Sequence, residues 1–240
     1  YVVIMVGLLG GIFTFLSIML CDTFASLGLG WLYFAIIGLR SIFMGTFGSV
    51  FNTYSGLYLA KDNDLLLSMP IPVRYILISR LMSVYLMGLS YSIVVILPAV
   101  IVYWVVAELS LASVIGGLLL ILLISVIVLV LSCVLGWVVA KISVKLKNKN
   151  IITVFVSLAF IVIYYTVYFK ASQLLQDLLA NAVTVGAKIK GTAYPLYMFG
   201  RMGEGDVLSI VVNVAAWGAI LAATFYVLSK GFIKIATATG

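Results

Sequence analysis

The chain has 240 residues, of which 65% are hydrophobic and only 9% are charged, and its mean hydropathy is +1.31. A soluble domain is about 45–50% apolar and about 25% charged, so this composition excludes a soluble fold and makes lipid the solvent for most of the chain. The net charge of +7 does not indicate nucleic-acid binding, because the basic residues lie in loops between apolar stretches, where they set membrane topology.

Six apolar stretches are long enough to cross a membrane as helices, since such a span needs about 20 residues. Their runs are continuous and do not alternate polar with apolar residues, which favours helices over barrel strands. The predicted spans are 1–20, 31–60, 77–106, 114–140, 151–169 and 207–228. We therefore expect an all-α membrane protein, a six-span polytopic helical bundle with a single transmembrane domain over 1–240.

The second predicted span carries small and polar residues at helical spacing. Small residues let helices approach closely, and polar ones satisfy each other across the contact. Close helix packing, a pathway lining and an interface with a second copy or half of the protein all remain open for this face. Arg40, a formal charge well inside a span, could reach toward the membrane surface or pair with Asp22. The candidate pathway or helix-interface residues are Arg40, Gly45, Ser49, Asn52 and Gly56.

The segment 61–76, between the second and third spans, breaks the hydrophobic pattern with "KDNDLLLSMPIPVRYI". Its acidic residues can accept hydrogen bonds from the free N–H groups at a helix start, and leucines follow at once. Pro70 and Pro72 then end the helix. A short amphipathic helix at the membrane surface is predicted, either a connector that dips into lipid headgroups or a helix that docks on a partner protein.

Lys and Arg are distributed unevenly between the two sides that six spans define. One side receives nine basic residues, Lys61, Arg74, Arg80, Lys141, Lys145, Lys147, Lys149, Lys230 and Lys234, and the other receives four, Lys170, Lys188, Lys190 and Arg201. Because positive residues are retained on the cytoplasmic side, both chain ends are expected in the cytoplasm of a multi-pass protein of the cytoplasmic (inner) membrane.

The stretch "LAKDNDLLLSMPIPVRYILISRLMSVYL" resembles the connection between the second and third spans of bacterial ATP-binding-cassette (ABC) permeases of the type-two superfamily. Within that superfamily it is most similar to permeases of Gram-positive exporters. The likeness rests on Asp62, Asp64, three leucines, the Met-Pro-Ile-Pro run and Arg80, and the six-span layout extends it over most of the chain. Some relatives are longer, which leaves open that these residues are one half of a larger permease.

The resemblance implies that segment 61–76 is a coupling helix docking on a separate cytosolic ABC ATPase subunit, whose closure moves the spans. It also implies a second permease copy or half. ATP and Mg would be used by the partner, since this chain lacks a GxxxxGK[ST] phosphate loop. The expected docking residues are Asp62, Asp64, Leu65, Leu66, Met69, Pro70, Ile71, Pro72 and Arg74.

The segment 170–206 precedes the last span on the less basic side. Its first part places Leu174, Leu178 and Ala182 on one helical face, and glycines, Pro195, aromatic residues and charges follow. Interfacial packing and a re-entrant cap or outer gate over a transport pathway are both open from the residues. The permease resemblance favours the cap, because such permeases carry extracellular helices at this position.

Catalysis and metal binding are not indicated. The chain has no histidine, and Cys21 and Cys133 are isolated thiols that form neither a disulfide framework nor a metal-ligand pattern. No nucleophile–base constellation is visible, so the chain is not expected to be an enzyme or to bind a cofactor itself.

The favoured function is ATP-driven export of a peptide, lipid or drug-like substrate, with membrane lipids as further partners. The alternatives are an ATPase-independent carrier or channel, disfavoured because the spans lack paired carboxylates, and a non-transporting membrane partner in signalling or assembly.

Overall fold

The computed structural model describes residues 2–58, 72–107, 110–145, 158–159, 161–163, 165–166, 169–170 and 180–239. The regular elements in these ranges are helices, and no strand occurs among them, as the composition predicts. They are α1 (Val2–Ser26), α2 (Gly30–Thr53), the π-helix η1 (Tyr54–Tyr58), α4 (Val73–Val106), α5 (Leu111–Lys145), α7 (Ala182–Thr192), α8 (Tyr194–Gly203) and α9 (Val207–Thr239).

Five of these helices, α1, α2, α4, α5 and α9, are long and apolar enough to cross a membrane. They coincide with the first four predicted spans and the last one. The predicted fifth span, 151–169, lies largely outside the described residues. The helices overrun the predicted limits, since α1 continues past Asp22 to Ser26 and α9 continues to Thr239. Hydropathy marks the lipid boundary, whereas a helix ends where its backbone hydrogen bonds end.

A glycine fixes the end of α1. Gly28 has a φ of +66°, a conformation that side chains with a Cβ rarely adopt. Its N–H donates to the carbonyl of Ala25 at 3.0 Å, and the N–H of Leu29 donates to the carbonyl of Phe24 at 2.8 Å. This pair of bonds satisfies carbonyls that the helix leaves free and turns the chain into α2.

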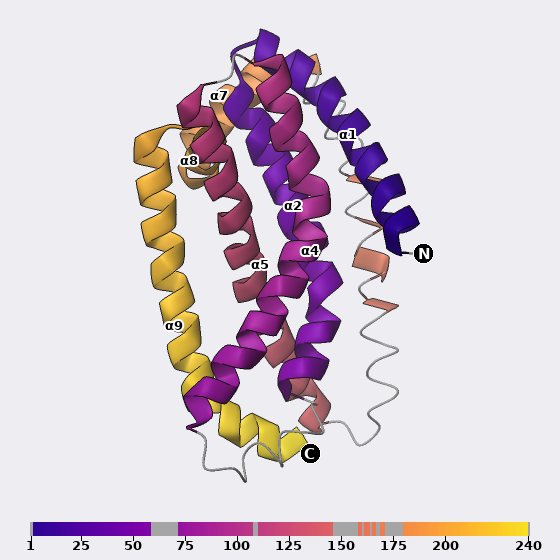
Figure 1. Cartoon of the computed structure of the whole chain (residues 1–240), viewed down its shortest axis with the longest axis vertical. Helices are drawn as coiled ribbons and strands as arrows, with labels where there is room; N and C mark the ends of the chain where they lie inside the picture. The colour runs from indigo at the N-terminus through magenta and orange to yellow at the C-terminus, as the bar shows by residue number, and fades with distance from the viewer. Residues whose placement is uncertain are drawn as a thin grey trace.

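The long helices form one bundle, in which α1 and α4 run toward one end and α2, α5 and α9 run toward the other (Figure 1). The α7–α8 pair, the start of α9 and the turn between α1 and α2 lie at one end, which we call the cap end. The end of η1, the start of α4 and the C-terminal part of α9 lie at the other, which we call the basal end. The successive helices α1, α2, α4 and α5 therefore pack as antiparallel neighbours, whereas α9 runs parallel to α5.

The core lies where α2 packs between α4 and α5. Tyr33, Phe34, Ile96 and Ile124 are fully buried there, and the Tyr33 hydroxyl donates to the carbonyl of Ala99 at 2.8 Å. By contrast, most of the α9 surface is exposed, with large apolar side chains facing outward from Val207 onward. Such a surface is stable only in contact with lipid or protein, in agreement with a membrane protein.

Candidate functional site

The predicted docking residues lie almost entirely outside the described residues. Asp62, Asp64, Leu65, Leu66, Met69, Pro70 and Ile71 belong to the gap between residues 58 and 72. Pro72 immediately precedes α4, and its carbonyl accepts a hydrogen bond from the N–H of Tyr75 at 2.9 Å. Arg74 lies in the first turn of α4. The docking role therefore stays a prediction, at the basal end of the bundle.

Two small residues of α2, Gly45 and Ser49, lie in close helix contacts. A Cβ at Gly45 would collide with the Ser92 hydroxyl of α4 and would lie 2.8 Å from a methyl group of Val128 in α5. Ser49 shares a short hydrogen bond with Ser132 of α5, and both side chains are buried. The three helices approach this closely because glycine and serine occupy the contact.

The candidate pathway or helix-interface residues Gly45, Ser49, Asn52 and Gly56 form a stripe along α2 and η1. The basal part of this stripe is less enclosed. Asn52 and Gly56 are half-buried, and a Cβ at Gly56 would meet no atom within 4 Å. Gly56 lies in η1, a π-helical turn that widens the end of α2. The stripe thus divides into a tightly packed section at Gly45 and Ser49 and an open section next to the predicted docking segment.

Arg40 lies against α1. Its guanidinium carbon is 5.2 Å from the centre of the Phe13 ring, which provides a cation–π contact inside the apolar part of the bundle. Asp22, the partner considered from the sequence, is nine residues beyond Phe13 on α1, a rise of about 13 Å at about 1.5 Å per residue. The position of Arg40 therefore favours the aromatic contact over an ion pair with Asp22.

The cap helix α8 packs onto α2 and α5 through glycines. A Cβ at Gly200 would collide with the backbone carbonyl of Trp31, and one at Gly203 with the Phe34 ring. On the α5 side, a Cβ at Gly116 would collide with the carbonyl of Met202 and lie 2.7 Å from the Cα of Gly205. These contacts leave space only for hydrogen atoms, so α8 lies directly against the backbones of both helices.

This helix also enters the bundle from the cap end. The Phe199 ring packs against Gly38 of α2, which lies eight residues beyond Gly30, a depth of about 12 Å along the helix axis. Phe199 and Met202 are buried. Helix α8 therefore packs inside the cap end of the bundle, and the role of a re-entrant cap over 170–206 stays a prediction. Of the predicted amphipathic face, Ala182 is buried at the start of α7, whereas Leu174 and Leu178 lie outside the described residues.

A charged cluster closes the turn between α8 and α9. Arg201 donates to Asp206 at 3.0 Å and to the Tyr197 hydroxyl at 3.1 Å, and its Nε lies 3.8 Å from Glu204. Asp206 also accepts the N–H of Ser209 at 3.0 Å, and so caps the first turn of α9. The hydrogen bonds from Ser209, with those from Arg201, hold the pKa of Asp206 below its usual range.

Glu204 interacts with the start of α2, as Asp206 does with the start of α9. The N–H of Trp31 donates to its carboxylate, so Glu204 interacts with the positive end of the α2 dipole from a different helix. Burial nevertheless raises the pKa of Glu204, against the opposing effects of Arg201 and the Trp31 hydrogen bond. Arg201 thus links two carboxylates, each of which lies at a helix N-terminus.

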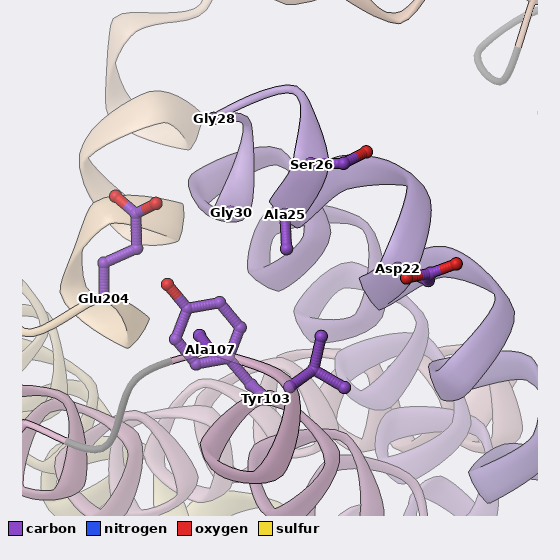
Figure 2. A pocket seen from close by; sticks show the side chains of 9 residues that line it. Asp22, Ala25, Ser26, Gly28, Gly30, Tyr103, Ala107 and Glu204 are labelled. Atoms are coloured by element: carbon purple, nitrogen blue, oxygen red, sulfur yellow. The ribbon is translucent and has the colours of Figure 1, made fainter.

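A pocket of about 430 Å³ opens beside Glu204, between the α1–α2 turn and the end of α4. Figure 2 shows the Tyr103 hydroxyl directed toward Glu204 beneath Gly30, whereas Asp22 and Ser26 lie on the far side with their oxygens directed away. No group of three or more His, Cys, Asp or Glu that could hold a metal ion occurs among the described residues.

Comparison of the chain with models of known protein families, with curated proteins and with solved structures finds no match. The likeness to type-two permeases therefore remains an expectation drawn from the sequence.

The sequence interpretation did not anticipate the roles of Arg201, Glu204 and Asp206. The signal was present in "FGRMGEGD", where glycines alternate with charges directly before an apolar span. Gly205 has a φ of +91°, and its N–H donates to the carbonyl of Met202 at 3.1 Å. A glycine that ends one helix, followed by an aspartate that caps the next, is a readable turn signature.

Proposed function

We propose that this chain is the membrane-spanning permease subunit of an ABC transporter in the cytoplasmic membrane. In this proposal it crosses the membrane six times, with both ends in the cytoplasm, and a separate ATPase subunit hydrolyses ATP with Mg. The permease performs no chemistry itself, works with a second permease copy or half, and exports a peptide, lipid or drug-like substrate.

The observation that carries the proposal is the separation of charge between the two ends of the bundle. The basal ends of α4, α5 and α9 carry Arg74, Arg80, Lys141, Lys145, Lys230 and Lys234. The described cap end carries Lys188, Lys190 and Arg201, together with the carboxylates of Asp22, Glu204 and Asp206. The positive-inside rule assigns the basal end to the cytoplasm.

The helix ends also support the position of the docking segment. η1 ends at Tyr58 and α4 begins at Val73, both at the basal end, so residues 59–71 connect two spans there. A cytosolic partner that binds this connection can push on α2 and α4 directly. Both helices pack on α5 through Gly45, Ser92 and Val128, so a displacement at the basal end is transmitted as rigid-body motion.

The re-entrant α7–α8 pair supports the transport part of the proposal. It covers the end of the bundle opposite the docking segment, where an exported substrate would leave. In this position it acts as the outer cap, and transport requires it to move relative to α2 and α5.

The proposal is tested by purifying the chain with its co-expressed ATPase subunit. Leu66→Asp combined with Met69→Asp should abolish co-purification of ATPase activity, because two charges in an apolar docking face leave the partner with unpaired buried groups. The matched control is Leu111→Asp combined with Tyr194→Asp, which changes two exposed apolar residues at the cap end. The control should keep the ATPase. Retention of the ATPase by the first variant contradicts the docking assignment.

A further inference from the structure

A second pocket at the cap end has a different chemical character from the one beside Tyr103. It measures about 390 Å³ and lies between α7, α8 and the α1–α2 turn. Trp31 and Tyr197 pack edge to face within it, with ring centres 4.9 Å apart. Leu29 and Val183 provide apolar walls. The pocket therefore offers aromatic and aliphatic surface at the end of a bundle of apolar helices, the level at which lipid headgroups lie.

Two cations share one aromatic ring in this pocket. The Lys190 ammonium lies 5.1 Å from the centre of the Tyr197 ring, and the Arg201 guanidinium carbon lies 5.9 Å from the same centre. Both side chains line the pocket. The ring brings both positive groups to the same pocket, so an anion in the pocket would lower the electrostatic energy of the site.

The Lys190 ammonium remains available for such an anion. The terminal nitrogens of Arg201 are engaged by Tyr197 and Asp206, but its Nε is buried and donates to no acceptor. The nearest carboxylate oxygen, on Glu204, is 3.8 Å away, beyond hydrogen-bond distance. Among the described residues, no carboxylate forms an ion pair with Lys190.

The charge balance also favours an anion. Asp206 compensates Arg201 through a direct ion pair. Glu204 lines the same pocket and lies 3.8 Å from the Arg201 Nε. Lys190 adds a positive charge with which no carboxylate of the described residues forms a direct ion pair.

We propose that this pocket binds a phosphate anion, with Lys190 as its donor and the Arg201 guanidinium as a second positive charge beside it. The apolar walls fit the acyl part of an amphiphile, so the expected source is an acidic phospholipid such as phosphatidylglycerol, with free phosphate as the alternative source. The inference does not depend on the transporter proposal, because the pocket lies at the opposite end of the bundle from the predicted docking segment.

The experiment places the full chain in phosphatidylcholine nanodiscs and titrates it with short-chain phosphatidylglycerol, short-chain phosphatidylcholine or inorganic phosphate. Binding is followed by native mass spectrometry. Phosphatidylglycerol should bind more tightly than phosphatidylcholine. Lys190→Gln should weaken its binding about tenfold, the effect of losing one charged hydrogen bond. The matched control is Lys188→Gln, which removes the same charge from an exposed side chain of α7 that does not line the pocket.

A third variant tests the cavity itself. Gly186→Leu keeps every charge and fills the pocket, because a Cβ at Gly186 meets Leu29 and Trp31 only at 3.5 Å and the longer side chain extends past them. It should also reduce phosphatidylglycerol binding. Binding of inorganic phosphate with the same dependence on Lys190 would assign the site to free phosphate. Equal binding of the two lipids, or equal losses in Lys190→Gln and Lys188→Gln, would overturn the proposal.

Discussion

Two regions of this molecule, the cap end and the middle of the bundle, satisfy the polar groups between packed helices in different ways. At the cap end, Arg201 connects the carboxylates of Glu204 and Asp206, and full charges hold α8 against the start of α9 and α2. In the middle of the bundle, where Arg40 contacts the Phe13 ring of α1, the contacts of α2 with α4 and α5 include neutral serine hydroxyls. Ser49 bonds to Ser132, and the Ser41 hydroxyl donates to the carbonyl of Ser92 at 3.0 Å.

The difference follows from depth in the membrane. A charge in the hydrocarbon region is costly, whereas a hydroxyl can bond to a neighbouring backbone or hydroxyl and leave nothing unpaired. Near the membrane surface, water and headgroups reduce the cost of charge, so ion pairs can be used there. We conclude that the bundle interior is built for close, permanent packing, and that the cap is held by contacts that pH and bound anions can alter.

The largest expected change in the free energy of unfolding comes from disturbing the packing of α8 against α2. Gly200→Ala would place a methyl group against the Trp31 carbonyl, which cannot move without displacing α2. We expect a loss of about 1–3 kcal/mol in the free energy of unfolding, the usual cost of overpacking. Thermal unfolding in detergent measures it.

The matched control for this change is Gly191→Ala. Gly191 is exposed in α7, and a Cβ there meets no atom within 4 Å. Alanine should stabilise α7 by about 0.5–1 kcal/mol through its helix propensity. If Gly200→Ala and Gly191→Ala behave alike, α8 is not seated against α2 as described.

The next largest change in the free energy of unfolding is expected at the ion pairs of the cap end. Asp206→Ala removes the N-cap of α9 and the closest partner of Arg201, and should cost about 0.5–2 kcal/mol. Because the folded protein holds the pKa of Asp206 below its unfolded value, this contribution is present above pH about 4 and is lost as the pH falls through the folded pKa. Chemical unfolding at neutral and acidic pH measures both features; an unchanged difference at low pH would exclude the ionic origin.

A smaller change in the free energy of unfolding is expected for the hydrogen bond between the Ser49 and Ser132 hydroxyls. Ser49→Ala should cost about 0.6 kcal/mol, the average found for hydrogen bonds between membrane helices. The double variant Ser49→Ala with Ser132→Ala should cost less than the sum of the single changes, because both partners of one bond are removed together. Ser90→Ala is the control, since the Ser90 hydroxyl is exposed and bonds within its own helix at 2.8 Å. Strict additivity would mean that the Ser49–Ser132 bond contributes nothing.

The smallest expected change is an increase in the free energy of unfolding. Glu204→Gln should make the protein more stable than the parent at neutral pH, because burial raises the pKa of Glu204 in the folded state. Stability from this group is full below its unfolded value of about 4.3 and declines as the pH rises through the folded pKa. The advantage of Glu204→Gln should therefore vanish in acid. A destabilised variant at neutral pH would show that the ion pair with Arg201 outweighs burial.

The sequence predicted the helical class and the positions of five spans because long apolar runs are a direct signal of helices in lipid. It did not reveal the internal docking of α8. That contact depends on glycines of α2, α5 and α8 meeting in space, as Gly116 meets Met202 and Gly38 meets Phe199. Neither composition nor periodicity records which small residues face each other.

The predicted pathway stripe on α2 shows the same limit. Its spacing indicated one face, but Gly45 lies in a packed contact while Gly56 has open space beside it. The spacing of small residues is the same for a packed interface and for a lined channel, so only the neighbouring helices distinguish them.

The central claim is that the connection between η1 and α4 faces the cytoplasm and carries an ATPase subunit. The most direct measurement is thiol labelling of single cysteines at positions 66 and 188, in vesicles of both orientations, with and without the ATPase subunit. The native Cys21 and Cys133 are buried and are replaced by alanine. We expect position 66 to be labelled only from the cytoplasmic side and to be protected by the ATPase. We expect position 188 to be labelled only from the opposite side. Labelling of both positions from one side, or no protection of position 66, would contradict the central claim.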